Sequence, residues 1–294
     1  MTARTLRLGT REWPPGAFAV MAVVNATPDS FYDQGATREF GAALAAASRA
    51  VAAGADIIDI GGVKAGPGDD VDVDEEVRRV AGLVAAVRAR HPGTVISVDT
   101  WRAEVGEAVA VAGADLLNDT WGGADPDLAG VAAAHGLGLV CAHTGEMAPR
   151  TGPLRPAYDD VVADVLAYVT AGADRAVAAG VRPDGILIDP AHDFGKNTWH
   201  SLELTRRTAD LAATGWPVLV AASHKDFVGE TLGLGVAERG EGTLAVLAVC
   251  AWEGARLFRV HNVRAAREAL AVVTRLRAAH AAAEGATPGR TPRT

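Results

Sequence analysis

The chain has 294 residues, a formal net charge of −8 and 49% hydrophobic residues, with 33 glycines and 14 prolines. This composition is too apolar for a disordered chain and too charged for a membrane bundle, and no stretch approaches the roughly 18 consecutive apolar residues of a membrane span. The negative charge and the lack of long basic runs argue against non-specific nucleic-acid binding. Cys141 and Cys250 are the only cysteines, which excludes a disulfide scaffold. Because the N-terminus shows no signal-peptide pattern, we expect a cytoplasmic protein.

Eight short apolar runs recur along the chain, at residues 19–25, 56–62, 94–100, 114–120, 138–144, 185–190, 217–223 and 255–263. Both faces of each run are apolar, which is typical of buried parallel strands. Ala-rich amphipathic segments of helical length separate them, for example at 38–54, 71–90 and 158–180. Gly54, Gly113 and Gly180 are suitable helix stops.

This alternation predicts an α/β fold, namely a (β/α)8 TIM barrel of a single domain. The alternative is an open doubly wound sheet. Nearly every run ends in a polar residue or Gly, and only in a barrel do all the strand ends meet at one face, which favours the barrel. We assign residues 1–18 to an N-terminal extension, 19–284 to the barrel and 285–294 to a disordered tail.

The polar strand ends include a set of side chains that suits a flat heterocycle. Asp99, Asn118 and Asp189 offer hydrogen-bond acceptors and an amide, and Lys225 adds a cation. Together they can bind the edge of a ring that carries amino and oxo groups. The alternative for Asp99 and Asp189 is that they cap helices at strand-to-helix turns.

The last apolar run ends in two residues that suit a phosphate. Arg259 and His261 are two positions apart, so their side chains point the same way from a strand. Asn25, at the end of the first run, can add an amide or help to place Mg2+ on that phosphate. The alternative is that Arg259 and His261 pair with acidic loop residues.

These motifs, in this order, resemble the dihydropteroate synthase family, which joins a 7,8-dihydropterin methyl diphosphate to p-aminobenzoate. The resemblance runs from residue 20 to about 263 and rests on NATPDSFYDQG (25–35), DIIDIGG (56–62), SVDT (97–100), LLNDTWGG (116–123), YDDVV (158–162), DPAHDFGK (189–196), the Ser-x-Lys at 223–225 and RVHNV (259–263). It implies a TIM barrel with a pterin pocket in its C-terminal mouth, and a homodimer formed through the later helices.

The resemblance also implies roles for individual residues, carried over by position. The pterin site would be formed by Asp99, Asn118, Asp189, Phe194 and Lys225, the diphosphate site by Arg259, His261 and Asn25 with Mg2+, and the catalytic roles would fall to Lys225, Asp99 and Asp33. The implied reaction is loss of diphosphate from the pterin methylene, followed by attack of an amine on the resulting cation.

The second loop departs from the family pattern. The family carries Ser-Thr-Arg-Pro-Gly after its Gly-Gly, whereas this chain has Ala65 in place of the threonine and Gly66 in place of the arginine. In the family, that arginine contacts the phosphate and p-aminobenzoate region. Lys64 is the neighbouring cation, but a lysine lacks the planar fork of an arginine.

Two further changes add carboxylates near the mouth. Asp226 replaces a serine that helps to hold the substrate carboxylate in the family, and His192 and Asp193 replace small neutral residues. A carboxylate from Asp226 would repel that of p-aminobenzoate and would suit an amine that bears a cation. The alternative is that Asp226 turns outward to solvent.

Two functions remain open from the sequence. The first is a dihydropteroate synthase-type transferase that uses p-aminobenzoate or a related amine in an altered acceptor site. The second is a pterin-binding paralogue without synthase activity. The set of changes resembles that of a divergent second paralogue of the family in high-GC bacteria.

Overall fold

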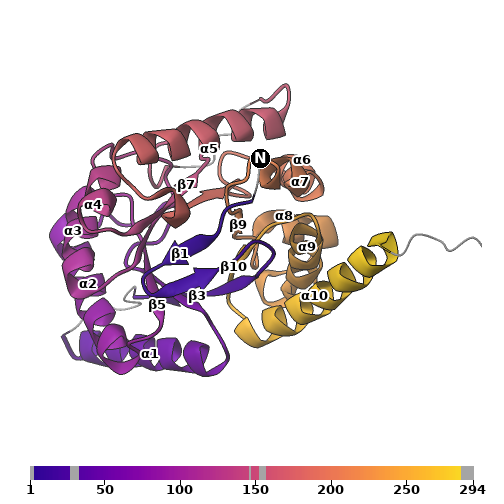
Figure 1. The fold of residues 1–294 in the computed structure, drawn as a ribbon. Coiled ribbons are helices and arrows are strands. Elements are labelled where there is room, and N and C mark those ends of the chain that lie inside the picture. The colour runs from indigo at the N-terminus through magenta and orange to yellow at the C-terminus, as the bar shows by residue number, and fades with distance from the viewer. Residues whose placement is uncertain (1–2, 27–32, 146, 152–156, 286–294) are drawn as a thin grey trace, which may run out of the picture.

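Eight parallel strands form a barrel that is surrounded by helices (Figure 1). The computed structural model describes residues 3–26, 33–145, 147–151 and 157–285. The strands are hydrogen-bonded in the order β8-β7-β6-β5-β4-β3-β10-β9, and a parallel bridge between Ile188 and Val218 joins the two ends of this series. The Ile188 N–H donates to the Pro217 carbonyl at 3.0 Å across the same seam. The prediction of a (β/α)8 barrel, rather than an open sheet, is therefore confirmed.

Every barrel strand lies inside one of the predicted apolar runs. The strands are β3 (Ala19–Asn25), β4 (Ile57–Gly61), β5 (Val95–Asp99), β6 (Leu116–Asp119), β7 (Gly138–Ala142), β8 (Ile186–Asp189), β9 (Leu219–Val220) and β10 (Leu257–Val260). β9 has only two residues in regular pairing, so the β8–β9 seam is the least paired part of the ring.

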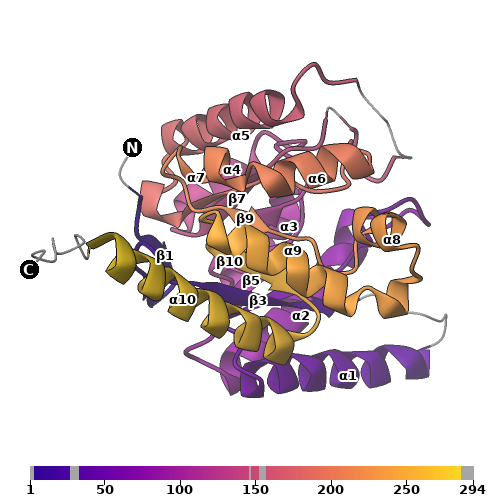
Figure 2. The ribbon, with the colours of Figure 1, turned by 90° about the vertical axis from the view of Figure 1, so that its right-hand side faces the viewer.

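Helices connect the strands on the outside of the barrel. They are α1 (Asp33–Ala52), α2 (Val73–Arg90), α3 (Ala103–Ala112), α4 (Leu128–Ala134), α5 (Val161–Ala178), α6 (Thr198–Arg206), α7 (Thr208–Ala212), α8 (Asp226–Leu232), α9 (Gly240–Trp252) and α10 (Val263–Gly285), with 3-10 turns η1 (Pro183–Gly185) and η2 (Val236–Glu238). Figure 2 shows α9 and α10 packed side by side. In the described part of the chain, no helix is both long and apolar enough to cross a membrane.

Local capping explains where several helices begin and end. The Asp72 carboxylate accepts the N–H of Glu75 at the start of α2, and Asp160 does the same for two N–H groups at the start of α5. The predicted stops Gly54, Gly113 and Gly180 have φ of 96°, 106° and 101°, a left-handed conformation that glycine adopts without strain.

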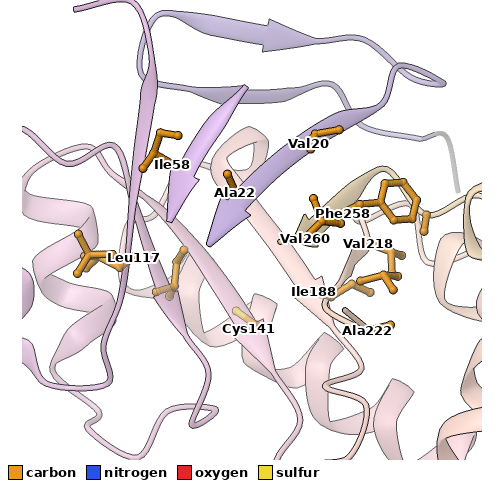
Figure 3. Packing of buried hydrophobic residues seen from close by; sticks show 14 of the residues in the cluster. Val20, Ala22, Ile58, Leu117, Cys141, Ile188, Val218, Ala222, Phe258 and Val260 are labelled. Atoms are coloured by element: carbon orange, nitrogen blue, oxygen red, sulfur yellow. The ribbon is translucent and has the colours of Figure 1, made fainter. Parts of the chain in front are cut away.

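The apolar residues form two layers on opposite sides of the strands. One layer fills the space between strands and helices, and Figure 3 shows Val20, Ile58, Leu117 and Phe258 within it. The other layer lies inside the amino end of the barrel and includes Met21. Because side chains alternate along a strand, each strand contributes to both layers.

A short hairpin closes the amino end of the barrel. It consists of β1 (Leu6–Leu8) and β2 (Arg11–Trp13), and its buried side chains belong to the inner layer. This hairpin lies in the segment assigned to an N-terminal extension. No periodic pattern marks it in the sequence, because strands of three residues are too short to show one. The domain limits at residues 19 and 284 stay predictions, and the proposed tail lies almost wholly outside the described residues.

Replacing Leu8 by alanine tests the hairpin as part of the core. Leu8 is fully buried, so Leu8→Ala is expected to lower the free energy of unfolding by about 2 to 5 kcal/mol, as measured by urea denaturation. The control is Val111→Ala on α3, where the side chain is 77% exposed and the expected change is below about 0.5 kcal/mol. Equally small effects in both variants would contradict a structural role for the hairpin.

Candidate functional site

The predicted site residues extend from the inner layer toward the carboxyl end of the barrel. Asn118, Asp189 and Arg259 each follow an inward-facing leucine by two positions, namely Leu116, Leu187 and Leu257. Side chains two positions apart on a strand share a face. These polar groups therefore point into the barrel above its apolar floor.

The strand register aligns further predicted residues at the same height. Asn25 pairs with Gly61, Gly61 with Asp99, and Asp99 with Asn118. Asn25 is exposed at the rim, whereas Asn118 is buried. The barrel thus gathers side chains that are far apart in the sequence at one end.

Asp59 is a central residue that the sequence analysis missed. It is fully buried, and its carboxylate accepts hydrogen bonds from the Ser97 hydroxyl at 2.6 Å, Arg259 Nε at 2.6 Å and Asn118 Nδ2 at 3.3 Å. Asp59 lies two positions after Ile57, so the inward alternation could have revealed it. It orients both an amide and a guanidinium in the site.

Arg259 pairs with two carboxylates inside the barrel. Its Nη2 donates to Asp99 Oδ2 at 3.0 Å, in addition to the bond from Nε to Asp59. The alternative that Arg259 pairs with acidic residues is therefore realised, although its partners lie on strands rather than on loops. Burial raises the pKa of Asp99 to about 6, while Arg259 and the Thr120 hydroxyl, at 2.9 Å, favour the ionised form.

Asn118 and its neighbour Asp119 have different roles. Asn118 faces the interior, whereas Asp119 accepts the N–H groups of Trp121 at 3.1 Å and Gly123 at 2.6 Å and so holds the following turn. Burial raises the pKa of Asp119 to about 7. The turn after β6 is therefore held by Asp119 and not by Asn118.

Asp189 and Lys225 form the opposite side of the site. Asp189 accepts the Ala191 N–H at 2.7 Å, and burial raises its pKa while the nearby Lys225 lowers it. Lys225 Nζ donates to the His192 carbonyl and lies 4.8 Å from the centre of the Phe194 ring. Burial lowers the pKa of Lys225, against the effects of Asp193 and Asp189. A cation, a carboxyl group and an aromatic ring thus lie together on this side of the site.

The loop that carries Phe194 is fixed by Lys196, which the sequence analysis left without a role. Lys196 Nζ contacts His143 Nδ1 at 2.8 Å and donates to the Phe194 carbonyl at 2.8 Å and the Ala191 carbonyl at 3.1 Å. His143 Nε2 lies 2.8 Å from Asp164. Burial and the nearby Lys225 lower the pKa of Lys196 to about 7. This buried amine positions Phe194 through its backbone.

His261 lies at the rim beside a second histidine. Its Nδ1 is 2.9 Å from the Ser223 hydroxyl, and its ring centre is 5.4 Å from that of His224. Burial, His224 and Arg259 lower the pKa of His261. The predicted catalytic residue Asp33 begins α1, but its side chain, like residues 27–32, lies outside the described part of the chain.

The altered positions are arranged differently from the sequence expectation. Asp226 is 78% exposed and pairs with Arg239 at 2.8 Å, so its carboxylate turns outward, the alternative we had left open. Lys64 is also exposed. Near this second loop lies another cation, Arg150, which donates to the Asp69 carbonyl at 2.7 Å.

Comparison with known proteins identifies the family of the barrel. A family model described as "Pterin binding enzyme" matches residues 21–261. The chain belongs to the pterin-binding enzyme family. Within this pterin-binding enzyme family, it is similar to the "Inactive dihydropteroate synthase 2" of Mycobacterium tuberculosis, with 59% identity over 258 residues that cover 86% of this chain and 81% of the relative.

Proteins named dihydropteroate synthase are also similar to this chain. The dihydropteroate synthase of Escherichia coli is 38% identical over 255 residues, which cover 86% of this chain and 90% of the relative. The structure of Xanthomonas albilineans dihydropteroate synthase with 4-aminobenzoic acid matches with a TM-score of 0.85 and 35% identity, covering 94% of this chain and 99% of that one. By its similarity to these relatives, the chain belongs to the dihydropteroate synthase family.

Removing the Asp59 charge tests its central position. In Asp59→Asn the Arg259 guanidinium loses its shortest carboxylate contact but keeps Asp99, so we expect a loss of about 1.5 to 3 kcal/mol in the free energy of unfolding. Chemical denaturation measures this loss. The matched control Glu107→Gln removes an exposed carboxylate beside His135 and should cost less than about 1 kcal/mol. If both variants lose a similarly small amount of unfolding free energy, Asp59 does not have the central position that we assign to it.

Proposed function

We propose that this protein binds a 7,8-dihydropterin methyl diphosphate in the carboxyl end of the barrel and transfers the pterin methylene to an amine other than 4-aminobenzoate. The observation that supports it is the grouping of Asp99, Asn118, Asp189 and Lys225, all of which face the interior from different strands or the loops after them. A second candidate, pterin binding without transfer, is favoured by the changes at Ala65 and Gly66 and by the name of the Mycobacterium tuberculosis relative.

The polar groups match the edge of a pterin. Asn118 Nδ2 donates to Asp59, which leaves Asn118 Oδ1 to accept a hydrogen bond from a ligand amino group. Asp189 adds a carboxylate acceptor, and Lys225 a donor for an oxo group or ring nitrogen. The Phe194 ring offers an apolar face beside Lys225.

The charges suit a reaction through a cation. The C–O bond to the diphosphate breaks, with its electron pair leaving on the diphosphate, and the pterin methylene becomes cationic. The lone pair of the amine then forms a C–N bond, and the amine loses a proton. The Asp99 carboxylate, mostly ionised at pH 7 because its pKa is about 6, stabilises the positive charge on the ring as it develops, and Asp189 places a second carboxyl group in the same site.

The leaving group is bound at the rim. Arg259 Nε and Nη2 are held by Asp59 and Asp99, so its Nη1 is the nitrogen that a diphosphate can take without displacing either carboxylate. His261 adds a second donor. Mg2+ neutralises the diphosphate when bound, and Asn25 would supply one amide oxygen to it. The remaining ligands would be diphosphate oxygens and water, because Mg2+ keeps several waters and binds substrate phosphates.

We also propose a homodimer formed through α9 and α10. These helices expose Val249, Trp252, Val272 and Leu276, which are large apolar side chains on neighbouring elements.

The two cysteines are buried and unpaired, which is consistent with a reducing compartment such as the cytoplasm.

Binding and diphosphate release test the proposed function separately. Titration calorimetry with 6-hydroxymethyl-7,8-dihydropterin diphosphate is expected to show binding that Mg2+ strengthens, and Asp189→Asn should weaken it by about tenfold or more. The control Asp210→Asn, on α7, should bind as the parent does. No binding by the parent protein would refute the proposal, whereas binding without diphosphate release in the presence of any amine would favour the second candidate.

Pterin affinity should depend on pH through Asp99. Because its pKa is about 6, the carboxylate is mostly protonated at pH 5 and mostly ionised at pH 7. Affinity for 6-hydroxymethyl-7,8-dihydropterin, which lacks a titrating phosphate, should therefore rise about tenfold between these pH values. Fluorescence titration measures this rise. Asp99→Asn should abolish it, and an unchanged slope in this variant would assign the titration to another group.

A further inference from the structure

The loops that follow β8 and β9 are joined by the carboxylate of Asp193. Its Oδ2 accepts the backbone N–H of Asp226 at 2.7 Å and that of Phe227 at 3.3 Å. Its Oδ1 accepts the Ser201 hydroxyl at 3.2 Å. The two backbone N–H groups directly follow Lys225 in the chain, so the carboxylate binds the start of α8 next to that residue.

The Asp193 side chain is held in place although the residue itself has an unfavourable backbone conformation. Asp193 has φ of 69°, in the left-handed region, and Ala191 two residues before it has φ of 49°. The Ser201 hydroxyl also accepts the Asp193 N–H at 3.1 Å, so side chain and backbone are fixed by the same residue. Asp tolerates this conformation better than most residues, but glycine adopts it without strain.

The charge of Asp193 acts on Lys225. Of the nearby carboxylates, Asp193 has the largest effect in raising the pKa of Lys225 against burial, followed by Asp189. Asp193 and Asp189 thus place negative charge around Lys225. A ligand carboxylate that approached Lys225 from this side would find its donors taken and a like charge in their place.

The carboxylate of Asp226, unlike that of Asp193, does not bind the start of α8. It points to solvent and pairs with Arg239, which also donates to the His224 carbonyl at 2.9 Å. The backbone N–H of Asp226 thus faces Asp193 while its own side chain turns away. The two acidic residues can be separated by experiment.

We propose that Asp193 is a specificity-determining residue, which excludes carboxylate-bearing amines from the Lys225 side of the mouth and leaves the site to neutral or cationic amines. This inference rests on the proposed function for its amine acceptor, but the exclusion of a carboxylate can be measured without any reaction.

The experiment measures binding of 4-aminobenzoate by titration calorimetry to the full-length protein, with and without saturating 6-hydroxymethyl-7,8-dihydropterin. Asp193→Gly relieves the left-handed backbone, frees both N–H groups and should bind 4-aminobenzoate at least about tenfold more tightly than the parent. Asp193→Asn, which tolerates the same φ, loses the charge but retains an acceptor and should show a smaller gain. Amide resonances of Asp226 and Phe227 should shift in Asp193→Gly and shift back on addition of 4-aminobenzoate.

Asp226→Asn is the comparison variant. A gain in Asp193→Gly that exceeds the gain in Asp226→Asn supports the inference. If Asp226→Asn shows the larger gain, or if Asp193→Gly retains its fold and pterin binding without any gain, the inference is wrong. Failure of the parent to bind pterin would count against the proposed function alone, because the 4-aminobenzoate comparison is also made without pterin.

Discussion

The ion pair between Asp59 and Arg259 is the interaction on which the site depends. Both groups lie inside the barrel, where an unpaired charge is costly, and Arg259 is the cation that pairs with the fully buried Asp59. Asp59 also fixes the Asn118 amide, and Arg259 contacts Asp99. The orientation of three predicted ligand-binding side chains therefore follows from one buried carboxylate. The apolar layer beneath them, closed by the amino-terminal hairpin, excludes water from below and strengthens these contacts.

The two sides of the barrel mouth differ in how far they depart from the family pattern. Asp99, Asn118 and Asp189, which are expected to bind the pterin, lie at the carboxyl ends of β5, β6 and β8. In the second loop, Ala65 and Gly66 stand where the resemblance implies a threonine and an arginine, and Lys64 beside them is exposed. The loops after β8 and β9 have gained a carboxylate that is bonded within the protein. Such a pattern is consistent with a retained heterocycle and a changed second substrate.

The fold could be predicted from the sequence because buried parallel strands are apolar on both faces, and this pattern is unmistakable in runs such as 19–25 and 94–100. The inward residues Asn118, Asp189 and Arg259 were found because they are polar and lie at or next to the carboxyl ends of their strands. Asp59 was missed because it lies within a run rather than at its end. The roles of Asp193 and Asp226 could not be separated, because side-chain direction in a loop depends on backbone angles that no periodicity encodes.

The uneven pairing around the ring has a consequence for motion. β4 and β5 pair over five residues, whereas β8 and β9 meet at a single bridge. Breathing of the native state should therefore start at this junction, where amide protons would exchange with solvent soonest. The bonds from Asp193 to the start of α8 cross the same junction at its carboxyl end. Asp193 therefore links the two loops at the least paired junction of the barrel. A substitution at this residue is expected to change both the local stability of the ring and the ligand preference that we propose for the site.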